Sequence, residues 1–173
     1  MKHLFLLSAV LLTSCGDGGK GTAEHVADTT VTARATYVVD LSEHDVPLKL
    51  DLGDRNTLGT DTVVVTWNEE FGRLEVRAGE HFGLNIMEEP ADLTRWKADL
   101  DRDMLQKHTI LEEGPDRLVY RSEFPDEAGV FIHFYRFITT AGRTFVITDA
   151  DEGRFNETDV QRMLKALVND QAA

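Results

Sequence analysis

VFIHFYRFI, residues 130–138, decides the fold of this chain. Alternate residues of a β-strand point to opposite faces of the sheet. All but two positions here are apolar or aromatic, so both faces of this strand need cover from other elements. The two exceptions, His133 and Arg136, fall on opposite faces, and each is expected to have a polar partner if it is buried.

Two amphipathic segments can supply that cover. One follows Pro90, a residue that suits a helix start, and its apolar residues recur at helical spacing. These residues are Leu93, Trp96, Leu100 and Met104. The other begins at Asn156, a good N-cap, with Asp159 in the capping-box position. Its apolar face consists of Val160, Met163, Leu164, Leu167 and Val168.

One helix on each face predicts an α+β protein, specifically a three-layer α/β/α sandwich with a mostly antiparallel sheet and two main helices. A helix-grip-like fold, in which a curved sheet wraps around the C-terminal helix, is the alternative. The remaining strands come from runs of alternating hydrophobicity between turn signals. They are expected at residues 48–52, 63–67, 74–76, 82–86, 109–111, 118–121 and 144–148, with loops or turns at 54–61, 114–116, 125–129 and 141–142. The strands after residue 108 form a four-stranded meander.

The N-terminus predicts export and lipid attachment. Lys2 precedes an apolar run over residues 4–12, which is too short to span a bilayer and matches the hydrophobic region of a secretory signal. The run ends in Leu-Thr-Ser-Cys at residues 12–15. This ending resembles the lipobox of bacterial lipoproteins, which implies that Cys15 is diacylated and anchors the mature chain to a lipid bilayer. Gly16 follows the cysteine and aspartate comes only at Asp17, which favours the outer over the inner membrane.

The sequence therefore divides into four parts. We expect a signal peptide at 1–15, a Gly- and Thr-rich flexible tether at 16–36, a single globular domain at 37–169 and a short tail at 170–173. The whole chain has 173 residues and a net charge of −13, which disfavours nucleic acid as a partner. Cys15 is the one cysteine of the sequence, so no disulfide within the chain is expected.

Two stretches, EEFGRLEV at 69–76 and FIHFY at 131–135, together with the order of the elements, carry a family resemblance. Over residues 46–168 the chain resembles the PsbP-like α/β/α sandwich domains of small lipoproteins. The resemblance implies an accessory or partner-binding role, and it transfers no site residue by position.

Candidate catalytic and metal-binding groups are sparse. Ser42 and Ser122 lie outside any Gly-x-Ser-x-Gly motif, and no two histidines have the spacing of a metalloprotease helix. The stretch 149–153 lacks the glycine and glutamate of a calcium loop and is expected to be a turn. His133 is expected to be a partnered core histidine, and His44 an exposed loop residue. The adjacent glutamates at 69–70, 88–89 and 112–113 should point to opposite faces and form no dyad.

The sequence thus predicts no catalytic residue, no cofactor and no metal site, with Cys15 as the lipidation site. The leading hypothesis is a non-enzymatic, membrane-anchored lipoprotein of the cell envelope that binds a protein partner. A small-molecule or ion-binding envelope protein is the first alternative. A hydrolase that uses dispersed carboxylates is the second.

Overall fold

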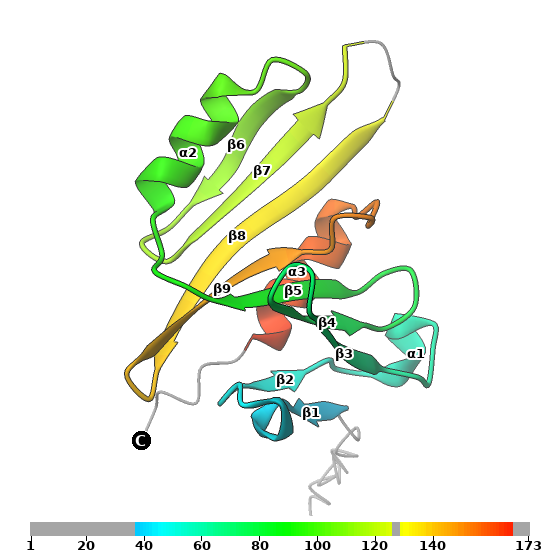
Figure 1. Ribbon diagram of the computed structural model, residues 1–173. Helices are drawn as coiled ribbons and strands as arrows, with labels where there is room; N and C mark the ends of the chain where they lie inside the picture. The colour runs from blue at the N-terminus through cyan, green and yellow to red at the C-terminus, as the bar shows by residue number, and fades with distance from the viewer. Residues whose placement is uncertain (1–36, 126–128, 168–173) are drawn as a thin grey trace, which may run out of the picture. The chain divides into compact units, whose positions relative to one another are not determined.

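The computed structural model describes residues 37–125 and 129–167, which belong to one compact unit. Cys15, the expected tether at 16–36, part of the turn at 125–129, and Val168 lie outside the described residues. In chain order (Figure 1), the elements are β1 (Val38–Asp40), η1 (Ser42–His44), β2 (Lys49–Asp51), α1 (Arg55–Leu58), β3 (Val64–Asn68), β4 (Arg73–Arg77), β5 (Gly83–Glu88), α2 (Leu93–Arg102), β6 (Lys107–Glu113), β7 (Arg117–Glu123), β8 (Val130–Thr140), β9 (Arg143–Asp149) and α3 (Glu157–Ala166).

Seven strands form one antiparallel sheet in the order β3-β4-β5-β9-β8-β7-β6, and β1 pairs with β2 in a separate two-stranded sheet. The predicted meander is confirmed, because β6, β7, β8 and β9 are neighbours in sequence order. The hairpin between β8 and β9 turns through Ala141 and Gly142, both with positive φ, as a two-residue turn of this kind requires. The α+β class with a mostly antiparallel sheet and two main helices is confirmed.

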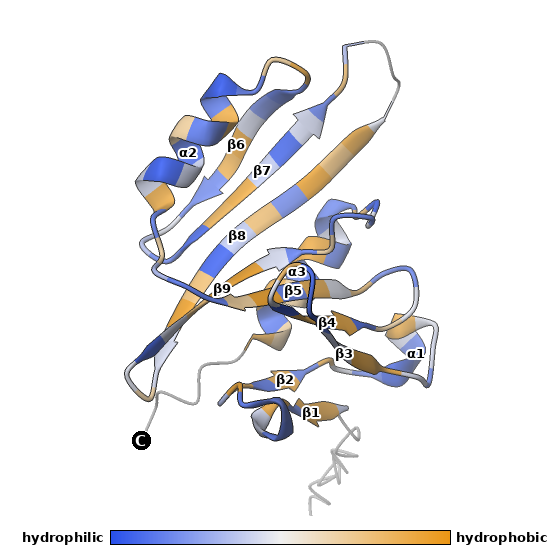
Figure 2. Cartoon of the chain, in the orientation of Figure 1, coloured by the Kyte–Doolittle hydropathy of each residue, from blue (hydrophilic) through white to orange (hydrophobic). Residues whose placement is uncertain are grey.

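The alternation of β8 divides its side chains between two separate cores. The core that α3 shares contains Ile132, Phe134 and Ile138 of β8. Tyr135 and Phe137 belong to the core that α2 covers with Leu93, Trp96 and Leu100. Figure 2 shows the corresponding mixture of hydrophobic and hydrophilic bands along α2 and the strands. Both apolar faces of the decisive strand are therefore packed.

The two polar residues of the stretch 130–138 have partners, as expected. Arg136 is buried on the side of α3, where its Nη1 donates to the carbonyl of Leu164 at 3.0 Å. Its Nε lies 3.6 Å from the carboxylate of Asp116. Burial lowers the pKa of this guanidinium, although the Asp116 charge opposes the effect. His133, on the other face, contacts Asp149.

The helix predicted after Pro90, α2, is shorter than its apolar stripe predicts. Asp92, not Pro90, caps α2 by accepting a hydrogen bond from the Arg95 N–H at 2.8 Å. The helix ends at Arg102, so Met104 lies beyond it with 95% of its surface exposed. The prediction that Met104 belongs to the apolar stripe of this helix was wrong. Helical spacing continues through Met104, but Asp103 terminates the helix with an extended backbone.

The expected loop at 54–61 contains the short helix α1. Asp54 caps it by accepting from the Asn56 N–H, and Gly59 ends it in the left-handed conformation. Leu58 is buried and ties the turn to the core. In contrast, α3 forms as predicted, with reciprocal hydrogen bonds between Asn156 and Asp159.

Candidate functional site

Two recesses on the domain contain chemically distinctive residues. The first, the histidine cleft, has a volume of about 330 Å³ and lies between the C-terminal half of α2 and strands β6–β9. The side chains that determine its chemistry are Asp103, His108, Tyr120, Ser122, His133 and Asp149. The second, the Trp67 pocket, lies where β3, β5 and β9 meet the segment after η1.

Tyr120 separates the two histidines of the histidine cleft. Its ring lies 5.3 Å from the ring of His133 and, edge-on, 5.8 Å from that of His108. Burial, assisted by the negative charge of Asp149, raises the pKa of the Tyr120 phenol. The phenol therefore stays neutral at physiological pH.

On one side of Tyr120, an acid, a histidine and a serine form a chain of hydrogen bonds. His108 Nδ1 lies 2.8 Å from Ser122 Oγ, and His108 Nε2 lies 3.0 Å from Asp103 Oδ2. A hydrolytic triad has the opposite ring orientation and an exposed serine. Here Ser122 is only 1% exposed, so its hydroxyl does not face a substrate. The chain of bonds ties the end of α2 to β6 and β7.

A β-bulge brings these residues together. Between Ile110 and Glu112 the register of β6 against β7 shifts, and beyond the shift His108 stands opposite Ser122. Without the shift, the turn at 114–116 would place His108 opposite Glu123. The bulge is therefore the local cause of the contact.

Asp103 should contribute to stability in a pH-dependent way. Hydrogen bonds from His108 first, and then from the backbone N–H groups of Leu105 and Gln106, hold the pKa of Asp103 below its ordinary value of 3.8. A lowered carboxyl pKa stabilises the fold above the ordinary value, and this contribution is lost as the pH falls through the folded-state pKa. We expect Asp103→Asn to lower the urea midpoint at pH 7, and the difference from wild type to shrink towards pH 3.

The matched control for this measurement is Asp101→Asn, which removes one exposed charge from the last turn of α2, two residues before Asp103. Its effect should be small and should not follow the same pH dependence. If the urea midpoints of the wild type and of Asp103→Asn differ by the same amount at pH 7 and at pH 3, the lowered pKa of Asp103 does not contribute to stability as proposed.

On the other side of Tyr120, Asp149 fills the point where β8 and β9 separate. The last paired residues there are Tyr135 and Thr148. Beyond them, Asp149 Oδ1 accepts from the Phe134 N–H at 2.9 Å, and Oδ2 lies 2.7 Å from His133 Nδ1. The carboxylate thus replaces a strand carbonyl and also holds the histidine.

The predicted turn after β9 is present, and its second acid is also paired. Asp151 accepts from Arg73 at 2.6 Å and from Asn85 at 3.2 Å. Burial opposes ionisation of the neighbouring Glu75, but hydrogen bonds from Arg73 and Asn68 prevail and lower its pKa. Within residues 37–125 and 129–167, no group of three or more His, Cys, Asp or Glu residues could hold a metal ion.

The Trp67 pocket has a volume of about 460 Å³ and a different composition. Its apolar lining includes Val46, Ile86 and Phe145, all buried, and Trp67, which is 52% exposed. His44, exposed as expected, is one of its polar lining residues. Apolar surface with few polar groups around it is typical of a binding recess.

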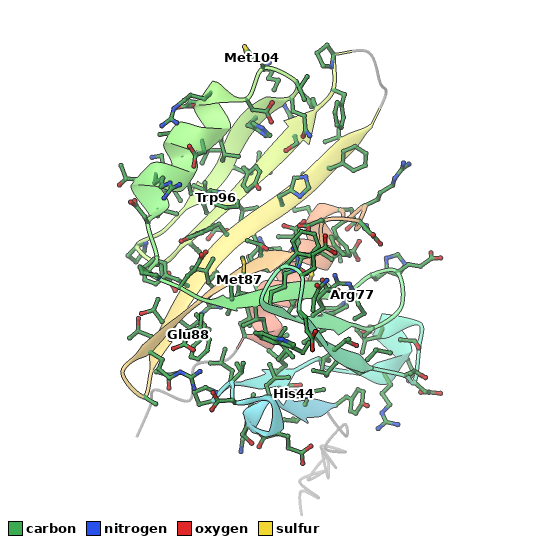
Figure 3. All side chains as sticks on the ribbon, in the orientation of Figure 1. His44, Arg77, Met87, Glu88, Trp96 and Met104 are labelled. Atoms are coloured by element: carbon green, nitrogen blue, oxygen red, sulfur yellow. The ribbon has the colours of Figure 1, made fainter. Side chains whose placement is uncertain are left out.

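Arg143 makes the polar rim of the Trp67 pocket rigid. Its Nε and Nη2 donate to the two carboxylate oxygens of Glu88 at 2.9 and 2.6 Å, and its Nη1 donates to the Asp45 carbonyl at 2.8 Å. The hydrogen bonds to Arg143 lower the pKa of Glu88. Figure 3 shows Glu88 and His44 at the same end of the domain, far from Met104.

Comparison with known proteins gives no relative: no family model, no curated protein and no solved structure matches the chain. Among the described residues, no helix is long and apolar enough to cross a membrane. Sequence reasoning did not find the contacts around His108 or the Trp67 pocket. The residues of both recesses come from segments far apart in the chain, so no local pattern marks them.

Proposed function

We propose that this chain is a lipid-anchored protein of the bacterial cell envelope whose domain binds another protein and catalyses no reaction. Acylated Cys15 would hold it in the bilayer, with the outer membrane favoured over the inner. Two acyl chains suffice for stable attachment, so the domain would need no membrane contact of its own.

We further propose that the domain is a three-layer α/β/α sandwich of the PsbP-like kind rather than a helix-grip fold. Two observations support this. The apolar residues of α2 and of α3 belong to separate cores, and consecutive residues of β8, such as Phe134 and Tyr135, are divided between those cores.

The observation that carries the binding role is the Trp67 pocket. A half-exposed tryptophan beside buried apolar residues offers apolar area to a partner. The histidine cleft offers less, because its serine, histidines and acids already bond one another. The same pocket supports the second candidate, a small amphipathic ligand, since its volume of about 460 Å³ is in the range of such sites.

The anchor and the binding surface can be tested together in intact cells. Benzoylphenylalanine, a photo-crosslinking residue, replaces Trp67, with the same residue at Asp101 as the control. We expect one discrete protein adduct at position 67, absent at position 101, in the membrane fraction. A parallel Cys15→Ser variant should lose acyl labelling and membrane fractionation while keeping the wild-type circular dichroism spectrum.

Both the crosslinking experiment and the Cys15→Ser variant have an outcome that would overturn the proposal. Retention of Cys15→Ser in the membrane would overturn the anchor. Absence of any protein adduct at position 67 would overturn partner binding, and co-purification of a small molecule lost on Trp67→Ala would favour the second candidate.

A further inference from the structure

We propose that the free edge of β3, together with the exposed side chain of Trp67, receives an extended segment of a partner protein that joins the sheet as an additional strand and carries basic residues at its ends. This inference rests on the proposed partner-binding function and names the surface and the chemistry of the partner.

One edge of β3 is unpaired within the described residues. β3 is a terminal strand of the seven-stranded sheet, and within the described part of the chain only β4 pairs with it. Its outer edge therefore carries backbone donors and acceptors that an added strand can use.

The two edges of the sheet differ in the way that distinguishes a docking edge from a protected one. The opposite edge, β6, has a bulge near Leu111 and carries charged residues at both ends. Charges and bulges prevent edge pairing. β3 has neither: its sequence is VVTWN, its pairing with β4 is regular, and Val64 and Trp67 are each about half exposed.

The exposed side chain of Trp67 provides an apolar neighbour for one side chain of the incoming strand. Trp67 and its partner across the ladder, Leu74, lie on the same face of the sheet. A strand added beside β3 would set alternate side chains on that face, and one of them would lie next to Trp67. An apolar residue at that position of the partner is expected.

The charges around β3 indicate which charge the partner segment carries beyond both ends of its strand. Asp61 lies shortly before the strand, and Glu69 and Glu70 follow it directly. All three are exposed, and none forms an ion pair with another described residue. An incoming strand with Lys or Arg beyond both ends would be attracted to them.

The same charges argue against a second copy of the chain as the occupant. In an antiparallel pair of β3 strands, Asp61 of one copy would approach Glu69 and Glu70 of the other. In a parallel pair, each acid would approach its own equivalent. Both arrangements place like charges together, which disfavours self-association.

The test uses the full lipidated chain in detergent and three synthetic peptides. The first has the core Thr-Val-Thr-Val-Thr between pairs of lysines, the second has the same core between pairs of glutamates, and the third is the lysine peptide with proline at its centre. Binding is measured by fluorescence anisotropy, and amide hydrogen exchange locates it. We expect only the first peptide to bind, with slower exchange in residues 64–68 and no change in residues 107–113.

Matched variants separate the two parts of the proposal. Glu69→Gln with Glu70→Gln should weaken binding of the lysine peptide about tenfold at low salt, and Trp67→Ala should weaken it by a similar factor. Asp101→Asn with Glu152→Gln removes the same charge from exposed positions elsewhere and should leave the affinity unchanged.

Equal binding of the lysine and glutamate peptides, protection of β6 instead of β3, or no binding would overturn the proposal. If the peptide fails but position 67 still forms a protein adduct in cells, the edge proposal falls and the proposed function stands. If the peptide binds as expected but no adduct forms in cells, the edge of β3 accepts a basic strand in solution, yet the proposed partner-binding function falls and the inference that rests on it falls with it.

Discussion

Phe134→Ala is expected to lower the free energy of unfolding by about 3–5 kcal/mol, the cost of deleting a buried phenylalanine. Phe134 is 0% exposed and lies on β8 within the core shared with α3. Its strand is central, with β7 on one side and β9 on the other, so the backbone has little freedom to collapse into the vacated space. Urea unfolding followed by circular dichroism measures the loss.

Phe71→Ala is the matched control, because it deletes the same side chain at a position that is 58% exposed. Phe71 contacts the Arg73 guanidinium, 4.8 Å from its ring centroid, so a loss of up to about 1 kcal/mol is expected. Similar losses for the two variants would show that β8 is not the centre of the core.

Asp149→Ala is expected to cost about 2–4 kcal/mol, since a buried backbone donor loses its acceptor and His133 loses its partner. Asp149→Asn retains one oxygen for the Phe134 N–H, and about half of the loss should remain. A double-mutant cycle with His133→Ala measures the coupling, for which about 1–3 kcal/mol is expected. Asp101→Asn again serves as the exposed control.

The cycle distinguishes two roles of this carboxylate. Additive losses would mean that Asp149 acts only on the strand backbone and that His133 is independent of it. If Asp149→Ala loses no more stability than Asp101→Asn, the separation of β8 and β9 does not depend on the carboxylate.

Most of the secondary structure could be predicted because its causes are local. The capping box joins Asn156 and Asp159, which are three positions apart, and the turn at Ala141 and Gly142 joins adjacent strands. Both faces of residues 130–138 are apolar, and this predicted cover on both sides of β8. The error at Met104 has the same origin, because periodicity does not show where a helix ends.

The contacts around the two recesses could not be predicted, because they depend on register and on distant segments. A single bulged residue in β6 decides whether His108 faces Ser122 or Glu123. Arg143 meets Asp45 across 98 positions of sequence, and Arg73 meets Asp151 across 78. No local pattern contains such pairings.

The sequence by itself determined the acidic charge, the order of helices and strands, and the need for cover on both sides of β8. It also predicts lipid attachment at Cys15, from the lipobox-like ending at residues 12–15. These properties follow from composition and short-range periodicity. Only the tertiary structure decided which strands became sheet edges, that the edge strand β3 pairs regularly while β6 is bulged, and that Trp67 borders an open pocket. The physical reason is that strand order and register are set by the packing of the whole sheet, which brings together side chains that are far apart in the chain.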